Sequence, residues 1–177
     1  MQNKHRIEEK LKVFLEAKHE ESRLINIINT IEKCKITGWE KWLQIELAHF
    51  LNNSFINENG YNWSREYGYT PTGEKAEKSL IYPDFAISFD NEKTLYLIEI
   101  KVNHDKSALE KGMTEDLKKY ENTKKLKWNK QSFPIKGVFF LGILTNSNKD
   151  SIKLIDCHIK GKIPETNSSY FLCYKAS

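Results

Sequence analysis

The stretch that decides the fold is YPDFAISFDNEKTLYLIEIKV, residues Tyr82–Val102. Two runs in which apolar residues alternate with other residues flank a polar turn, a pattern typical of a β-hairpin. A turn centred on Asn91 and Glu92 places Asp84 directly opposite Glu99. Directly opposed residues in an antiparallel pair have Cβ atoms about 5 Å apart. The sequence therefore predicts two carboxylates close together.

One face of this predicted hairpin is apolar and the other carries charge. Residues two apart in a strand point to the same side, so Asp84, Glu99 and Lys101 share a face. The opposite face fixes the register, because a slip by one residue would expose its whole apolar row. That row consists of Phe85, Ile87, Phe89, Tyr96, Ile98, Ile100 and Val102. Opposed like charges are destabilising, so the two acids indicate a cation between them; an exposed face of ordinary salt bridges is the alternative.

The rest of the chain predicts one α/β domain. The expected elements are helices over residues 4–33 with a break near 19–22, a strand at 62–67, a loop at 68–79, a helix over about 107–124, and strands at 135–144, 152–159 and 170–174. The continuous apolar run 135–144 is typical of a central strand covered on both faces. This order of elements implies a mixed sheet with helices on both faces.

A further helix is predicted from Trp39 to about Leu51, preceded by a capping box in which Thr37 is the N-cap and Glu40 reaches back. Glu46 falls within the apolar stripe of this helix. A carboxylate there is costly unless it meets a cation or a hydrogen-bond donor, which makes Glu46 a candidate site residue. The alternative is that Glu46 lies at the edge of the stripe and extends into solvent.

Composition limits the class of protein. The chain has 177 residues, 39% hydrophobic and 29% charged, with a net charge of +4, which suits one domain that tolerates a polyanionic partner. No apolar run reaches the roughly 18 residues of a membrane span, and the N-terminus lacks the apolar core of a signal peptide. Three cysteines without metal-binding spacing are expected to be buried free thiols in a reducing compartment, which indicates a cytoplasmic protein.

The charged face of the hairpin is suited to phosphodiester hydrolysis. Asp84 and Glu99 offer hard oxygen ligands, which suit Mg²⁺, with Mn²⁺ as a substitute. The Ile100 carbonyl is a further candidate ligand, and Glu46 would join, directly or through water, if its helix reaches the site. A bound metal polarises a phosphoryl oxygen and favours hydroxide, and Lys101 would orient the water or stabilise the developing negative charge.

Pro83-Asp84 followed by Glu99-Ile100-Lys101 resembles the PD-(D/E)xK signature of the restriction-endonuclease-like nuclease superfamily. The resemblance implies that the two acids bind Mg²⁺ and that both acids and the lysine are catalytic. It also implies an αβββαβ core with a central mixed sheet flanked by helices, and cleavage of DNA by most members.

Other residues extend this resemblance, which covers about residues 37–145. Glu46 resembles the additional helical glutamate that many members carry and that supports the metal and catalysis. Asp116, Lys119 and Tyr120 resemble a helix motif seen after the active strand, which implies a supporting role at the site.

We therefore expect a single nuclease-like domain over residues 1–177, with an N-terminal helical extension at 1–35 and its core at 37–145. The expected function is a Mg²⁺-dependent nuclease that acts on DNA, without membrane association. The basic stretch 118–130 suits phosphate contacts. Two alternatives remain open: a catalytically silent module that binds nucleic acid or protein, and a toxin or defence nuclease that acts on RNA. The apolar stripes of residues 4–33 favour packing within the domain, with a homodimer as the alternative.

Overall fold

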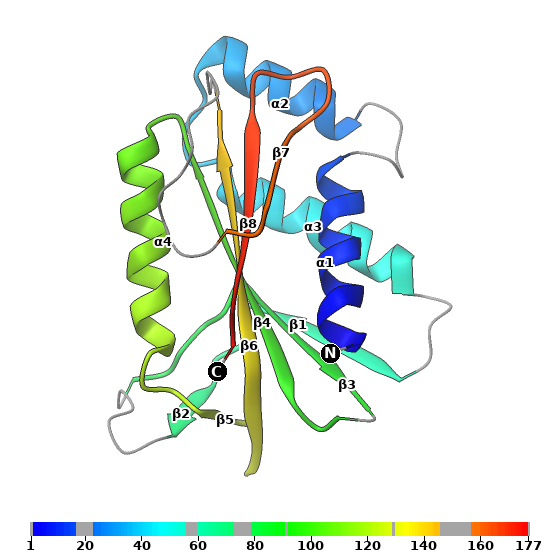
Figure 1. Cartoon of the computed structure of the whole chain (residues 1–177), viewed down its shortest axis with the longest axis vertical. Helices are drawn as coiled ribbons and strands as arrows, with labels where there is room; N and C mark the ends of the chain where they lie inside the picture. The colour runs from blue at the N-terminus through cyan, green and yellow to red at the C-terminus, as the bar shows by residue number, and fades with distance from the viewer. Residues whose placement is uncertain are drawn as a thin grey trace.

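The computed structural model describes residues 2–16, 23–55, 60–72, 79–90, 92–128, 130–145 and 157–176. These residues form a mixed α/β fold in which four helices flank one mixed sheet (Figure 1). The elements are α1 (Gln2–Leu15), α2 (Arg23–Cys34), α3 (Glu40–Phe55), β1 (Tyr61–Arg65), β2 (Thr70–Thr72), β3 (Phe85–Phe89), β4 (Leu95–Asn103), α4 (Lys106–Tyr120), β5 (Lys125–Trp128), β6 (Gln131–Leu144), β7 (Ile159–Lys162) and β8 (Ser169–Ala176).

The sheet is organised around β4 and β6, which run parallel. Parallel neighbours need a crossover connection, and α4 supplies it. On one side of this pair the order continues through β3 to β1, both antiparallel to their neighbours. On the other side the long strand β6 pairs first with β5 and then with β8. The predicted central position of residues 135–144 is confirmed, and the strand begins earlier than expected.

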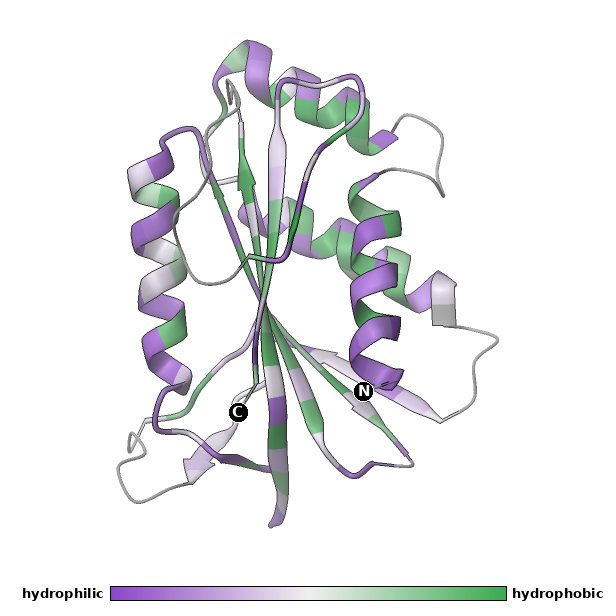
Figure 2. Cartoon of the chain, in the orientation of Figure 1, coloured by the Kyte–Doolittle hydropathy of each residue, from purple (hydrophilic) through white to green (hydrophobic). Residues whose placement is uncertain are grey.

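The sheet separates two apolar cores. One lies between the sheet and α1, α2 and α3, and includes the predicted apolar row of the hairpin. The other lies under α4 and includes Leu97, Leu109, Met113 and Phe140. Figure 1 shows α4 on one side of the sheet and α1 and α3 on the other, and Figure 2 shows the hydrophobic segments of the central strands between them. Both faces of β4 are therefore buried from Leu95 to Ile100, which encloses Glu99, whereas Lys101 is partly exposed.

The hairpin register predicted from the sequence is confirmed. Phe85 pairs with Ile98 and Ile87 pairs with Tyr96, which is the register that sets Asp84 toward Glu99. The strands predicted near residues 62–67 and 170–174 are also present, as β1 and β8. The helix expected over 107–124 is α4, which ends at Tyr120.

Other expectations need correction or fall outside the described residues. The segment 68–79 was expected to be a loop, but Thr70–Thr72 form β2 at one end of the sheet. A central proline usually argues against a strand, yet an edge strand tolerates it. Most of the strand expected at 152–159 lies outside the described residues, and β7 begins at Ile159.

The capping box predicted before α3 does not form. The helix begins at Glu40, because the Leu43 N–H donates to the carbonyl of Trp39 at 3.1 Å. Gly38 adopts a φ of 72°, in the left-handed region, so the chain turns between Thr37 and the helix. Glu40 is therefore the first residue of the helix rather than the third, and its side chain is directed elsewhere.

The N-terminal helices pack within the domain. The apolar residues of α1 and α2 are almost fully enclosed, including Leu11 and Ile28 at 0% exposure. Both predicted stripes thus belong to the chain's own core, which agrees with packing within the domain. No helix within the described ranges is both long and apolar enough to cross a membrane.

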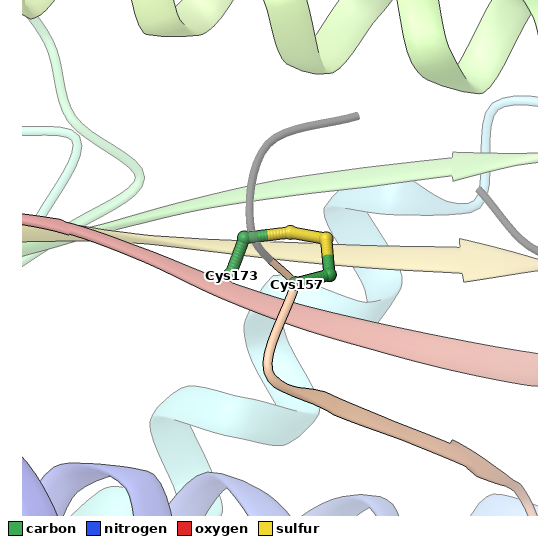
Figure 3. The surroundings of a disulfide bond; sticks show 2 residues. All are labelled: Cys157 and Cys173. Atoms are coloured by element: carbon green, nitrogen blue, oxygen red, sulfur yellow. A yellow bond between two sulfur atoms is a disulfide. The ribbon is translucent and has the colours of Figure 1, made fainter. Parts of the chain in front are cut away.

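The cysteines do not behave as predicted. Cys157 and Cys173 form a disulfide between the segment before β7 and strand β8 (Figure 3), and Cys34 is an exposed free thiol. The spacing of the cysteines does not predict this pairing, because the two residues are brought together only by the pairing of β7 with β8. Disulfides are rare in cytosolic proteins, so the pairing removes the reason for expecting a cytoplasmic protein.

We expect reduction of the disulfide to lower the free energy of unfolding by about 3 kcal/mol, because the bond closes a loop of sequence separation 16. Urea unfolding of the Cys34→Ser protein with and without reductant measures the difference without interference from the third thiol. In the unreduced wild-type protein, one thiol, that of Cys34, should titrate both with and without denaturant. Three thiols titrating without reductant would contradict the pairing.

Candidate active site

The two predicted carboxylates lie where β3 and β4 meet. Asp84 immediately precedes β3, and Glu99 lies in the middle of β4. Both side chains are buried, with exposed fractions of 8% and 3%. Since α4 covers this face of the sheet, the alternative of an exposed face of ordinary salt bridges is excluded.

Asp84 is held by a hydrogen bond to each carboxyl oxygen. Gln44 Nε2 donates to Oδ1 at 2.6 Å, and the Ile100 N–H donates to Oδ2 at 2.7 Å. Arg65 in turn donates to the Gln44 carbonyl oxygen at 3.0 Å, which fixes the orientation of that amide. Burial raises the pKa of Asp84, and Glu40 raises it further, while the Ile100 N–H opposes the rise. The two hydrogen bonds thus fix the orientation of the carboxyl group.

The backbone N–H and carbonyl of Ile100 both face the Asp84 side of β4. Extending the hairpin register beyond Phe85 would set Pro83 opposite Ile100. Proline has no N–H, so it cannot donate to the Ile100 carbonyl as an ordinary antiparallel partner would. The N–H and C=O of one residue in such a strand point to the same neighbour. The Ile100 carbonyl therefore faces the Asp84 side, which fits its predicted role as a metal ligand.

Glu99 is the most perturbed acid of the cluster. Its carboxylate accepts a hydrogen bond from the hydroxyl of Tyr120, a residue of α4. Burial raises the pKa of Glu99 to about 8, and the negative charges of Asp84 and Asp116 add to the rise. The charge of Asp84 thus disfavours the ionised form of Glu99, in the direction that the sequence predicts.

Lys101 lies between α4 and the beginning of α3. Its Nζ is 3.1 Å from Asp116 Oδ2 and 3.4 Å from Glu40 Oε1. Burial disfavours its charged form, but Asp116, Glu40 and Asp84 outweigh that effect and raise the pKa of Lys101. A Cβ at Gly112 of α4 would lie 3.2 Å from the Lys101 side chain, so a glycine there leaves room for the lysine.

The supporting residues on α4 are brought to the cluster as predicted. Asp116 is buried and forms ion pairs with both Lys101 and Lys119. Tyr120 binds Glu99. Positions 116, 119 and 120 lie on one side of a helix, and that side faces β4. Their placement agrees with the expectation, and their catalytic role stays a prediction.

Glu46 is not brought to the cluster. Its carboxylate accepts a 2.7 Å hydrogen bond from Arg23 of α2, which supplies the cation that a buried acid needs. Two residues along a helix are about 200° apart, so Glu46 points away from Gln44. The helix does reach the site, but through Glu40 and Gln44, which are one turn apart and which the sequence reasoning missed.

A count of charges shows what the cluster lacks. Four carboxyl groups, those of Glu40, Asp84, Glu99 and Asp116, surround two ammonium groups, those of Lys101 and Lys119. With all of them ionised, the cluster would carry a formal charge of −2. Burial makes such an excess costly, and the raised pKa of Glu99 reflects it. A divalent cation would balance the charge.

The donor set fits Mg²⁺ better than a metal with many protein ligands. Within the described ranges, no three or more His, Cys, Asp and Glu side chains are arranged to hold a metal ion. Mg²⁺ keeps several waters and is usually bound through one or two carboxylates. Asp84, Glu99 and the Ile100 carbonyl are the groups that would hold such an ion.

Comparison of the chain with models of protein families, with curated proteins and with solved structures found no match. The class that the geometry defines is a mixed α/β domain with a buried cluster of carboxylates and lysines at the junction of β3, β4 and α4.

Proposed function

We propose that the chain is a divalent-metal-dependent nuclease with a restriction-endonuclease-like core. The observation that carries the proposal is the buried pair Asp84 and Glu99 beside Lys101, in which burial and the charge of Asp84 disfavour the ionised form of Glu99. The element order α3, β1, β3, β4, α4 and β6 supports the same core, with β2 and β5 as insertions.

Asp84, Glu99 and the Ile100 carbonyl would hold Mg²⁺, or Mn²⁺ in its place. The ion supplies a Lewis acid for the phosphoryl oxygen and lowers the pKa of bound water. Gln44 and the Ile100 N–H fix the Asp84 carboxyl group. Tyr120 orients Glu99 through its hydroxyl, which leaves the other Glu99 oxygen available to a ligand.

Lys101 carries the remaining chemistry. Its ammonium group remains charged over the whole physiological range, since neighbouring acids raise its pKa against the effect of burial. A fixed positive charge stabilises the negative charge that develops on a phosphoryl group in the transition state, and its N–H groups orient the attacking water. Asp116 and Glu40 position this ammonium group from two different helices.

We propose nucleic acid, with DNA as the first candidate, as the substrate. Exposed lysines occur after α4 and along β5, including Lys124, Lys125, Lys127 and Lys130. Lysines that contact phosphates release bound counterions, so binding should weaken steeply with salt. The preference for DNA over RNA derives from the resemblance of the motif.

The test is incubation of the protein with supercoiled plasmid, single-stranded DNA and RNA, with Mg²⁺, with Mn²⁺ and with EDTA. We expect metal-dependent cleavage of DNA and none in EDTA. Cleavage of RNA alone would favour the toxin or defence nuclease. An absence of cleavage together with an absence of Mg²⁺ binding in calorimetry would reject the nuclease proposal and favour a catalytically silent binding module.

A further inference from the structure

A cavity of about 580 Å³ lies beside the candidate active site, on the same face of the sheet. Its floor is formed by side chains of β1, β3 and β4, among them Ser64, Ala86 and Ser88. Ala86 belongs to the core on the α4 side of the sheet. Asp84 and Ser88 lie two residues before and two residues after it, so their side chains point to the same face. In Figure 1 the hairpin end of β3 lies well below α4.

The cavity exists because of residue size. Ser64, Ala86 and Ser88 are small side chains, so they leave space above the sheet surface there. At a rise of about 3.3 Å per residue, Ala86 lies about 7 Å and Ser88 about 13 Å along the strand from Asp84. The cavity is therefore within reach of a group attached close to a phosphate at the proposed metal site.

Aromatic rings wall this cavity. Tyr67, Tyr69 and Phe133 line it, and the rings of Tyr67 and Tyr69 meet edge to face with centroids 5.5 Å apart. The Tyr69 hydroxyl is bonded to Ser64 Oγ at 2.9 Å, which holds its ring in place. Tyr67 is 42% exposed, so an entering planar group can lie against its ring.

Polar groups lie at the rim of the cavity. Asp90, Lys93 and Asn62 line it, and Asn62 donates to Asp90 at 3.2 Å. An apolar aromatic pocket with a few polar groups is the usual form of a small-ligand site. Unpaired nucleobases are recognised in this way, by stacking on aromatic rings and by hydrogen bonds to their edges.

We propose that this cavity binds an unpaired nucleobase of the strand whose phosphate would lie against the metal ion bound by Asp84 and Glu99. The inference rests on the proposed nuclease function and specifies its substrate as a single-stranded or locally opened nucleic acid. A paired base cannot enter without leaving its stack. Lys93, at the rim of the cavity, provides a positive charge for a backbone phosphate next to the bound base.

Binding in EDTA tests the pocket without cleavage. The probes are a fluorescein-labelled single-stranded DNA, an RNA of the same sequence, a strand of the same length with abasic sites throughout, and the blunt DNA duplex. We expect an intact single strand to bind about tenfold more tightly than the abasic strand or the duplex. Equal affinity for the intact and abasic strands would overturn the proposal.

Three variants make the test specific. Tyr67→Ala removes a partly exposed ring and should reduce the affinity for the intact strand about tenfold, while Tyr67→Phe keeps the ring and should retain it. Ser88→Leu fills the cavity and should have the same effect as Tyr67→Ala. Undiminished affinity of both Tyr67→Ala and Ser88→Leu for the intact strand would overturn the assignment. So would binding of a free mononucleotide to the wild type as tightly as the intact strand.

The result is separable from that of the nuclease test. Base-dependent binding that Tyr67→Ala abolishes supports the pocket even if the wild type cleaves no substrate, in which case only the proposed activity fails. Metal-dependent cleavage with no preference for intact over abasic strands in binding leaves the activity in place and overturns the pocket alone.

Discussion

Replacing Lys101 with alanine should lower Mg²⁺-dependent cleavage by at least about a hundredfold, because it removes the fixed positive charge beside the carboxylate pair. Asp116 should remain buried and satisfied, since Lys119 also pairs with it. The fold should therefore persist, as judged by circular dichroism and the thermal midpoint. Cleavage rates of the variant and the wild type under saturating Mg²⁺ measure the effect.

The matched control is Lys111→Ala, which removes an exposed lysine from the same helix that covers the site. It changes the net charge of the protein equally, so it reports any general electrostatic loss of substrate binding. Full activity in Lys101→Ala, or an equal loss in Lys111→Ala, would reject the assigned role of Lys101.

Asp84→Asn tests the metal in the same assay and in calorimetry with Mg²⁺. Asparagine keeps the shape of the side chain but only one acceptor, so one of the two donors, Gln44 Nε2 or the Ile100 N–H, loses its partner at a cost of about 1–3 kcal/mol. Alanine removes both acceptors, so Asp84→Asn is the milder of the two substitutions. Glu46→Gln distinguishes the two roles considered for Glu46, an ion pair with Arg23 and support of the metal site. The ion pair with Arg23 predicts that Glu46→Gln retains cleavage, whereas the sequence-based role predicts a loss.

The hairpin was predictable because its chemistry admits one register. The apolar row from Phe85 to Val102 has to face a core, and a slip by one residue would expose all of it. Once the register is fixed, the relation of Asp84 to Glu99 and of Glu99 to Lys101 follows from strand geometry alone. The same argument holds for β6, whose continuous apolar run suits only a central strand.

The helical contribution to the site was not predictable from the sequence. Helical spacing shows which residues share a face, but the rotation of α3 about its axis depends on packing against α1, α2 and β4. Glu46 was chosen because an acid within an apolar stripe needs a partner, and the partner proved to be Arg23. Gln44, a neutral residue, gave no comparable signal, although it is fully buried and binds Asp84.

The disulfide and the edge strand were missed for related reasons. The pairing of Cys157 with Cys173 depends on the path of the chain into β7, and the sequence there has weak strand character. Strand β2 contains Pro71 and lacks apolar alternation, so only its pairing with β5 defines it. Both features are products of tertiary contacts that local patterns do not encode.

Glu99→Gln should stabilise the metal-free protein at alkaline pH by about 2–4 kcal/mol. In the folded wild type the pKa of Glu99 is raised to about 8, chiefly by burial, from a value of 4.5 for the unfolded chain. Between these two values the folded state holds a proton that the unfolded state has released. The stability is therefore fully present below about pH 4.5 and is lost as the pH rises through about 8.

Glutamine removes this dependence because it cannot ionise, and its carbonyl oxygen can still accept the hydrogen bond from Tyr120. The two proteins should be similarly stable near pH 4.5 and should diverge with increasing pH. Urea unfolding in EDTA at pH 5, 7 and 9 measures the divergence. Glu9→Gln, at an exposed position of α1, is the control for the loss of one carboxylate.

Mg²⁺ should reverse the order of stability in this comparison. An ion that binds only the folded state stabilises it in proportion to the logarithm of its concentration, and binding is strongest when Glu99 is ionised. At pH 8 the wild type should therefore gain stability with Mg²⁺, and Glu99→Gln should gain much less. Parallel pH profiles of the two proteins in EDTA would show that Glu99 is not a buried, repelled acid. Equal gains with Mg²⁺ would show that it is not a ligand, so the two halves of the argument can fail separately.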